Sequence, residues 1–560
     1  MSKARTNAET LRTALVAGDV TNANFTGADL DIAKGGTGAS SAGAARTALG
    51  LAIGTDVLAP NGSAANLTNL PAGGNEVEFI ASGTLPNGKP VILKANGQVE
   101  VVNESTTSIS ESIPSGSSAV FNSGSTNSVS AAFDPYQKNK FLVVYKDAGN
   151  SNYGTIILGT VSNNSISFGS ELVFYSEASN IFCVVFDPNT SGKFLVTYQK
   201  SNAQGAAKVG TLSGSSISFG SEAVFNAATT SEITATYDPN TANKCVITFK
   251  DFGNSQRGTA IGGSISNTSI SFGSKVVFSN SGSLINTSFD PNTNTQFIVT
   301  HKVNGNNHGA AIVGTLYSDS SLSFGTAVVF NSQGTTLHIN VAFSLNDANK
   351  LAVVYQNGGN SSYGTSILGT IAANGNLSFG TPVVFNAANS QNMSIAFDPN
   401  TSGKFIISYR ESANTGYGNL VVGTLSGSSL SYSSANVLES SGLASNQVSF
   451  DPNNIGKFVV AYQDTGASSA GKAVLGQVAA SVVATNLTST NFLGTSTAAY
   501  TNGQTATIML QGGVSTNQSS LTIGSTYYVQ PAGTLATSAG IPSVIAGKAV
   551  KATTLLLKGI

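Results

Sequence analysis

The sequence Ser167-Phe168-Gly169-Ser170-Glu171-Leu172-Val173-Phe174 recurs, with small changes, through the middle of this 560-residue chain. A short way on, each copy continues with an aromatic residue and an Asp-Pro turn, here Phe186-Asp187-Pro188-Asn189, and then with an apolar run, here Lys193 to Tyr198. Self-similarity at a fixed period is the signature of a repeat architecture. The repeat therefore decides how the rest of the chain is interpreted.

The aromatic residue before Asp-Pro marks seven copies of the repeat. Successive markers are 53, 51, 52, 54, 54 and 53 residues apart, and they are Phe133, Phe186, Tyr237, Phe289, Phe343, Phe397 and Phe450. The fifth copy reads Ser344-Leu345-Asn346-Asp347 after its marker, so it lacks Asp-Pro but keeps the strand that follows. The middle of the chain is a tandem array of one structural unit.

Each copy contains four apolar runs separated by turns rich in Asn, Gly, Ser and Pro; in the second copy they are residues 181–186, 194–198, 206–212 and 217–225. Four short strands in about 50 residues are typical of a propeller blade, and propellers usually have about four to eight blades. A β-sandwich needs about 100 residues for each domain. The sequence predicts an all-β protein whose residues 111–480 form a seven-bladed β-propeller.

A propeller has to join its last blade to its first. The Ser-Phe-Gly strand follows six of the seven copies, and the seventh copy ends at Val478 without one. Residues 113–121, ahead of the first copy, end in Val120-Phe121 and match the missing piece. We expect this segment to complete the last blade as its outer strand, which removes the open edges of a linear array.

Three further regions flank the repeats. Residues 1–75 are predicted to contain short helices, because the apolar residues of the first 18 positions fall on one helical face. Residues 76–110 are predicted to form a small β module with turns at Asn87-Gly88 and Asn96-Gly97, dipeptides that accept positive φ. A change of composition towards Thr, Ala and Gly predicts a separate small β domain at residues 481–560.

The composition excludes several classes of function. Charged residues make up 9% of the chain and the net charge is -1, so we expect no nucleic-acid partner held by bulk electrostatics. No run of about 18 apolar residues predicts a membrane span, and residues 1–16 do not resemble a signal peptide. Cys183 and Cys245 form neither a disulfide framework nor a metal site, and Cys245 occupies a column of buried apolar residues. We expect no cofactor and no metal.

The segment from Lys34 to Leu51 carries the clearest resemblance to a known family. It runs Lys34-Gly35-Gly36-Thr37-Gly38 into an Ala-rich stretch that ends Ala45-Arg46-Thr47-Ala48-Leu49-Gly50-Leu51. It resembles a motif of bacteriophage tail fibres, and residues 524–549 are similar to a C-terminal β domain of marine phage tail proteins. The resemblance implies a homotrimer docked to other virion tail proteins through its N-terminal region, and a virion localisation after assembly in the host cytoplasm.

The loops between the second and third strands of each copy differ from one copy to the next. The candidate binding residues in these loops are Tyr153, Lys200, Phe252, Arg257, His308, Tyr363 and Tyr417. Aromatic rings among Asn, Gln and Ser suit carbohydrate binding, because rings stack on the C–H faces of sugars and amides bond the hydroxyls. The alternative is that these rings only cap the ends of the blades, and the sequence leaves both interpretations open.

Other side chains are predicted to have no chemical role. The Asp-Pro turns are nearly identical, which suits a structural task because Pro presets φ and Asp caps its own turn. His301 falls in a column of aromatic residues and is predicted to be a packing substitute. Asp147, Asp251, Glu411 and Asp464 share one position, and we interpret them as surface charges because a basic residue precedes three of them.

The sequence therefore predicts a protein without enzymatic activity, a virion tail fibre or tail-associated protein that recognises a glycan or protein receptor on the host surface. Two alternatives remain open. One is a structural tail component such as a nozzle or adaptor, and the other is a propeller depolymerase that cuts surface polysaccharide.

Overall fold

The computed structural model describes residues 75–560 except residues 294, 413–415, 467, 541 and 559–560. Throughout this range the regular structure is β-strand, apart from short 3-10 stretches such as Phe252–Asn254, so the predicted all-β class is confirmed. The chain divides into two compact units, residues 108–482 and residues 75–107 with 483–560. The expected N-terminal helices and the motif at residues 34–51 lie outside the described residues.

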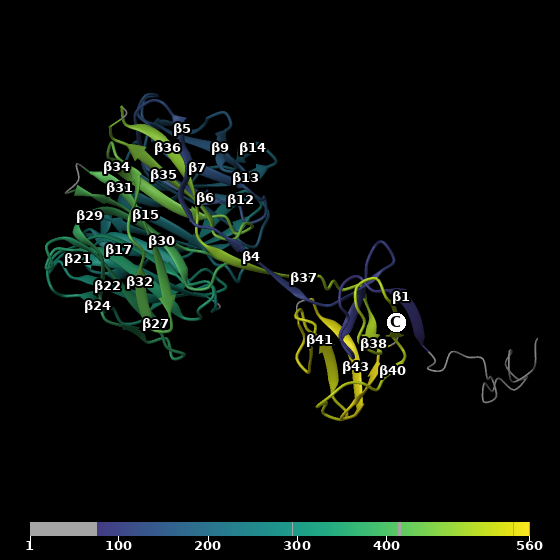
Figure 1. Ribbon diagram of the computed structural model, residues 1–560. Coiled ribbons are helices and arrows are strands. Elements are labelled where there is room, and N and C mark those ends of the chain that lie inside the picture. Colours follow the sequence, from purple (N-terminus) through teal and green to yellow (C-terminus); the bar gives the residue numbers. More distant parts are fainter. Residues whose placement is uncertain (1–74, 294, 413–415, 467, 541, 559–560) are drawn as a thin grey trace, which may run out of the picture. The chain divides into compact units, whose positions relative to one another are not determined.

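In the first of these units each copy of the repeat forms antiparallel strands that pair in chain order (Figure 1). The first strands are β6 (Thr126–Phe133), β11 (Asn180–Phe186), the second part of β15 (Ala223–Tyr237), β20 (Gly282–Phe289), β25 (Thr336–Phe343), the second part of β29 (Val383–Phe397) and β34 (Leu443–Phe450). The second strands are β7 (Lys140–Asp147), β12 (Lys193–Gln199), β16 (Lys244–Asp251), β21 (Gln296–Val303), β26 (Lys350–Asn357), β30 (Lys404–Glu411) and β35 (Lys457–Asp464). The third strands are β8 (Tyr153–Ser162), β13 (Gln204–Ser213), β17 (Arg257–Ser266), β22 (Gly309–Leu316), β27 (Tyr363–Ile371), β31 (Tyr417–Ser426) and β36 (Ala470–Gln477).

The recurring Ser-Phe-Gly stretch forms two short strands, where the sequence predicted one. In the first copy, β9 (Ser165–Phe168) pairs with the end of β8, and β10 (Leu172–Ala178) then pairs with its beginning. A glycine inside a strand commonly marks a bend, and Gly169 lies between the two pieces. The other first pieces are β14 (Ser216–Phe219), β18 (Ser269–Phe272), β23 (Leu322–Phe324), β28 (Leu377–Phe379) and β32 (Ser429–Tyr432). The other second pieces are the beginnings of β15 and β29, and β19 (Val276–Ser279), β24 (Val328–Asn331) and β33 (Asn436–Glu439).

The seventh copy takes its outermost strand from ahead of the first copy. β5 (Ser112–Asn122) pairs antiparallel with β36, with Asn122 opposite Gly471 and Ser112 opposite Gln477. Figure 1 shows β5, in blue, beside the green β36. This is the place where the sequence put residues 113–121. The first strand of the last copy, β34, also contacts β6 of the first copy, so the sequence of contacts between neighbouring copies returns to its start.

The hydrophobic core lies between neighbouring sheets, and the second strands are buried on both faces. Phe141, Val143 and Tyr145 of β7 pack with residues of the seventh copy, while Leu142 and Val144 pack with residues of the second copy. Alternate residues of a strand point to opposite faces of its sheet. This is why the second strands read as unbroken apolar runs.

A close approach between a ring and a glycine is repeated in the copies. In the first copy the ring of Phe141 lies over Gly159, where an added Cβ would come within 2.2 Å of the ring. In the third copy Cys245 takes the place of the ring and lies over Gly263. Cys245 is fully buried, which confirms it as an apolar substitute in this column.

The Asp-Pro turns lie where the first strand of each copy meets the second, and we call the side of the unit that they form the turn face. Their aspartates are 0–1% exposed: Asp134, Asp187, Asp238, Asp290, Asp398 and Asp451. Each accepts a hydrogen bond of 2.8–2.9 Å at Oδ1 from the backbone N–H two residues on. In the fifth copy Ser344 replaces this aspartate, and its Oγ accepts from the N–H of Asp347.

Hydrogen bonds also link each turn to the next one. In chain order, Tyr136 Oη donates to Pro188 O, Asn189 Nδ2 to Asp238 O, Asn240 Nδ2 to Thr293 O, Asn292 Nδ2 to Ser344 O, Asn346 Nδ2 to Pro399 O, Asn400 Nδ2 to Pro452 O and Asn453 Nδ2 to Pro135 O. The last bond joins the seventh copy to the first. We call this set the turn belt, and it explains why these turns vary so little in sequence.

The other unit combines the two segments that flank the repeats. One sheet has the order β1 (Glu76–Ile80), β39 (Thr505–Leu510), β38 (Phe492–Ser496), β2 (Pro90–Leu93) and β3 (Val99–Val101). The second has the order β40 (Val514–Ser515), β44 (Thr554–Leu557), β43 (Val544–Lys551), β41 (Thr526–Val529) and β42 (Leu535–Ala536). β4 (Glu104–Ile109) and β37 (Ala480–Thr485) pair with each other where the chain passes from one unit to the other. Residues 76–110 and 481–560, predicted as separate modules, thus share a sheet.

The pairing of β5 with β36 leads to a first prediction. Phe121 is 4% exposed, and its ring lies 5.1 Å from that of Tyr145 and 5.7 Å from that of Phe168. F121A should lower the free energy of unfolding by about 3–5 kcal/mol, the usual cost of a large buried side chain. V120A, at a neighbour that is 51% exposed, should change it by no more than about 0.5 kcal/mol. Denaturant titration of both variants measures these changes, and equal effects would contradict a packed closure.

Candidate functional site

The loops between the second and third strands lie at the opposite ends of the second strands from the Asp-Pro turns, and we call this side the loop face. The sequence-predicted binding residues lie here. Tyr153, Arg257, Tyr363 and Tyr417 are the first residues of β8, β17, β27 and β31, His308 directly precedes β22, Lys200 follows β12, and Phe252 begins the 3-10 turn. The four that begin third strands are equivalent, since each lies opposite the last residue of the second strand of its copy.

Phe252 is the most accessible of these candidates. Its side chain is 41% exposed, whereas the other six residues are half-buried. The turn that carries it is capped by Asp251, whose Oδ1 accepts from Gly253 N at 3.0 Å. Lys250 Nζ lies 5.2 Å from the centre of the Phe252 ring, within the range of a cation–π contact. The ring is therefore partly exposed at the surface, beside the Lys250 ammonium group.

Lys200 is not a free cation. Its Nζ lies 2.6 Å from Glu222 Oε1, and the same carboxylate accepts from Tyr198 Oη. The hydrogen bond that Lys200 donates to the Glu222 carboxylate raises the pKa of Lys200. Lys200 belongs to an internal ion pair of the second copy, so its availability for a ligand is lower than the sequence suggested.

The acidic column was predicted to be surface charge, and that prediction is wrong for three of its members. Asp147, Asp251 and Asp464 are 6%, 1% and 0% exposed. Asn122 Nδ2 donates to Asp147 Oδ1 at 3.2 Å, and Asn226 Nδ2 donates to Asp251 Oδ1 at 3.1 Å. A buried carboxylate needs such partners, because burial penalises an unpaired charge. In the first and third copies these bonds tie the second strand to the strand that arrives ahead of it.

The seventh copy shows the same tie with an ion pair. Lys472 Nζ lies 2.5 Å from Asp464 Oδ2 and 3.1 Å from Glu439 Oε2. Burial alone would raise the pKa of Asp464, but the Lys472 ammonium and the Ser441 hydroxyl outweigh it and lower that pKa. Lys472 thus engages both carboxylates, and this ion-pair network joins the second and third strands of the seventh copy to the strand that arrives from the sixth.

No group of three or more His, Cys, Asp or Glu side chains that would suit a metal ion occurs in the described part of the chain. The same part contains no helix of the length and apolarity that a membrane span requires. His301 is 2% exposed and its ring meets the edge of Phe278 at 5.5 Å, which confirms its predicted packing role.

A cavity of about 330 Å³ opens on the loop face between the fourth and fifth copies. Phe330, Pro382 and Val384 form its apolar wall, and Asn331 and Asn357 are among its polar residues. The sequence did not predict this cavity. The available signal was the proline at position 382, where the first three copies carry the charged residues Glu171, Glu222 and Lys275.

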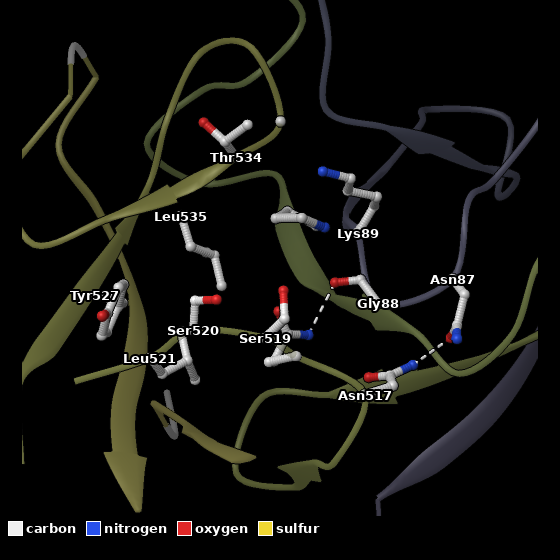
Figure 2. A pocket seen from close by; sticks show the side chains of 13 residues that line it. Asn87, Gly88, Lys89, Asn517, Ser519, Ser520, Leu521, Tyr527, Thr534 and Leu535 are labelled. Atoms are coloured by element: carbon white, nitrogen blue, oxygen red, sulfur yellow. Dashed lines mark hydrogen bonds between the residues drawn. The ribbon is translucent and has the colours of Figure 1, made fainter. Parts of the chain in front are cut away.

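A second cavity, of about 350 Å³, lies in the unit that contains residues 483–560 (Figure 2). Figure 2 shows Leu521 and Leu535 on the side of Tyr527, and Asn87 and Asn517 at the other end. Asn517 Nδ2 donates to Asn87 Oδ1, and Gln518 Nε2 donates to Gly88 O at 2.8 Å. These amides are occupied in joining the two flanking segments, which gives this cavity a structural explanation.

The strand order and the contact between the last and first copies define a β-propeller-like repeat protein. No family model matches the chain, and no curated protein matches it. Solved structures are distantly similar. The BP39L lectin from Burkholderia pseudomallei aligns with 65% of this chain and 97% of its own at 11% identity and a TM-score of 0.47. Sqt1 from Chaetomium thermophilum covers 64% of this chain and 90% of its own length, at 12% identity and a TM-score of 0.40. Sqt1 from Saccharomyces cerevisiae covers 71% of this chain and 99% of its own length, at 12% identity and a TM-score of 0.39.

The buried histidine gives a pH-dependent prediction. Burial lowers the pKa of His301 to about 4, below the value of about 6.5 in an unfolded chain. Protons therefore favour the unfolded chain, and the contribution of His301 to stability falls as the pH drops from about 6.5 towards 4. H301F, which restores an aromatic ring, should remove a loss of up to about 3 kcal/mol over this window. Melting temperatures at several pH values measure it, and parallel curves for both proteins would contradict the assignment.

Proposed function

We propose that this protein is a non-enzymatic tail fibre or tail-associated protein of a virion, and that its repeats form a seven-bladed β-propeller that recognises a glycan or protein on the host surface. Its N-terminal region docks it to other tail proteins, and the chain is a homotrimer. The observation that carries the proposal is the contrast between the two ends of the repeats. The turn face is constant and internally bonded, whereas the loop face is different in every copy.

The contrast has a physical basis. On the turn face the buried aspartates and the amides of the turn belt bond to protein groups, so changes there cost stability. On the loop face the buried acidic column fixes the strand ends, and the residues just beyond it are held without being part of the core. A rigid scaffold that carries variable loops is the usual arrangement of a binding surface.

The half-exposed aromatic and basic residues of the loop face are the proposed contacts. Phe252 is 41% exposed, and Arg257 begins the next strand of the same copy. Aromatic and arginine side chains are enriched among residues that dominate binding energy. The other candidates, Tyr153, Tyr363 and Tyr417, occupy the position of Arg257 in other copies and would contribute their ring edges.

Binding of the labelled full-length chain to whole cells from a panel of marine bacteria tests the proposal. F252A combined with R257A should weaken binding to responsive strains by about tenfold or more. Y136A is the matched control, because Tyr136 is an aromatic residue that is 50% exposed on the turn face. It should leave binding unchanged.

Two outcomes would contradict the proposal. Release of new reducing ends from surface polysaccharide by the purified chain would indicate a depolymerase. Binding that is lost with Y136A and kept in the loop-face variant would place the contact on the turn face.

A further inference from the structure

The cavity of the fifth copy can be compared with the same place in the other copies, because the strand registers align them. Val276 and Val383 are equivalent, since they lie opposite Ala260 and Ser366 at the same step of their third strands. Lys275 and Pro382, one residue earlier, are therefore equivalent as well. By the same registers Asn331 corresponds to Asn226, and Asn357 to Asp251.

In the third copy a lysine side chain occupies the position where the fifth copy has its cavity. Lys275 Nζ lies 3.0 Å from Asn226 Oδ1 and 3.1 Å from Asp251 Oδ2. In the fifth copy a proline replaces the lysine, and the neutral Asn357 replaces the aspartate. Asn331 and Asn357 occupy the positions of the two residues that bind the ammonium group in the third copy, while no lysine side chain fills the space between them.

Two other copies fill the place with charged side chains as well. In the second copy Glu222, equivalent to Pro382, pairs with Lys200 and accepts from Tyr198 Oη. In the seventh copy Lys472 pairs with Asp464. Lys472 lies opposite Tyr462, and Thr365 lies opposite Tyr355, so Lys472 is the equivalent of Thr365 in the fifth copy. In the fifth copy both positions carry uncharged residues, Pro382 and Thr365, and both line the cavity of about 330 Å³.

The lining of the cavity has free hydrogen-bonding capacity. Within the described residues the side-chain amides of Gln333 and Asn360 make no hydrogen bond, and neither does Asn357 Nδ2. Asn331 Nδ2 donates to Thr336 Oγ1 at 2.9 Å, which fixes the amide next to them. Beneath the wall, Tyr355 packs on Phe330 at 5.2 Å between ring centres, and its buried Oη has no partner in the described chain. In the first copy the equivalent hydroxyl, Tyr145 Oη, donates to Glu171 at 2.8 Å.

We propose that this cavity binds one neutral sugar residue, with Phe330, Pro382 and Val384 against a C–H face and the amides of Gln333, Asn357 and Asn360 bonded to hydroxyls. The inference rests on the proposed function and names the chemical class of its ligand. No charged side chain lines the cavity, so it offers no counter-ion to a uronate or a sulfate. An apolar wall with a few converging polar groups is the usual form of a small-ligand site, and its volume is within the usual range of about 300–1,000 Å³.

Saturation-transfer NMR of the full-length chain with glucose, galactose, mannose and N-acetylglucosamine tests the proposal, with glucuronate as the charged comparison. P382K combined with N357D rebuilds the ion pair of the third copy inside the cavity and should abolish the signal from the neutral sugar that binds. A327K places a lysine at the equivalent position of the fourth copy and should leave the signal unchanged. Melting curves establish that both variants are folded.

The outcomes separate this inference from the proposed function. A signal from a neutral sugar that disappears only in the P382K and N357D protein supports the cavity as its site. A signal that survives in that protein, or no signal from any neutral sugar, overturns the inference even if cells are still bound through the loop face. Sugar binding at the cavity without any binding to cells would instead leave the inference standing and overturn the proposed function.

Discussion

The buried aspartate of the Asp-Pro turn is the interaction on which the repeat unit depends. Its carboxylate is removed from water, and the backbone N–H groups of its own turn compensate for the lost hydration. A second oxygen reaches the neighbouring copy, since Asn243 N donates to Asp187 Oδ2 and Asn139 N donates to Asp451 Oδ2. The second of these bonds joins the seventh copy to the first. At these two turns the same side chain shapes its own turn and binds the neighbouring copy.

Fixing one end of every copy leaves the other end free to change. At the loop face the tie between copies is made by different chemistries: Asn with Asp in the first and third copies, Lys with two carboxylates in the seventh, and amides alone in the fifth. All of them hold the strand ends. They differ in how much space their side chains leave unoccupied, and in the fifth copy this space is a cavity.

The sequence predicted the features that depend on the repeat period and on the pattern of apolar residues within each strand. The repeat boundaries, the buried second strands and the role of Cys245 all follow from apolar residues that recur at fixed positions. It did not predict that residues 76–110 and 481–560 share a sheet, because pairing between distant segments leaves no local pattern. It also misjudged Asp147 and Asp251, since a preceding basic residue resembles a surface pair until Asn122 and Asn226 are seen to cover the carboxylates.

The central claim is that the repeats contact the host through the loop face and not through the turn face. Hydrogen–deuterium exchange of the full-length chain, alone and bound to envelopes of a responsive strain, measures this residue by residue. The account predicts slower exchange in loop-face segments such as 147–153 and 357–363, with no change in the Asp-Pro turns. Protection confined to the turns, or to the unit that contains residues 483–560, would contradict it.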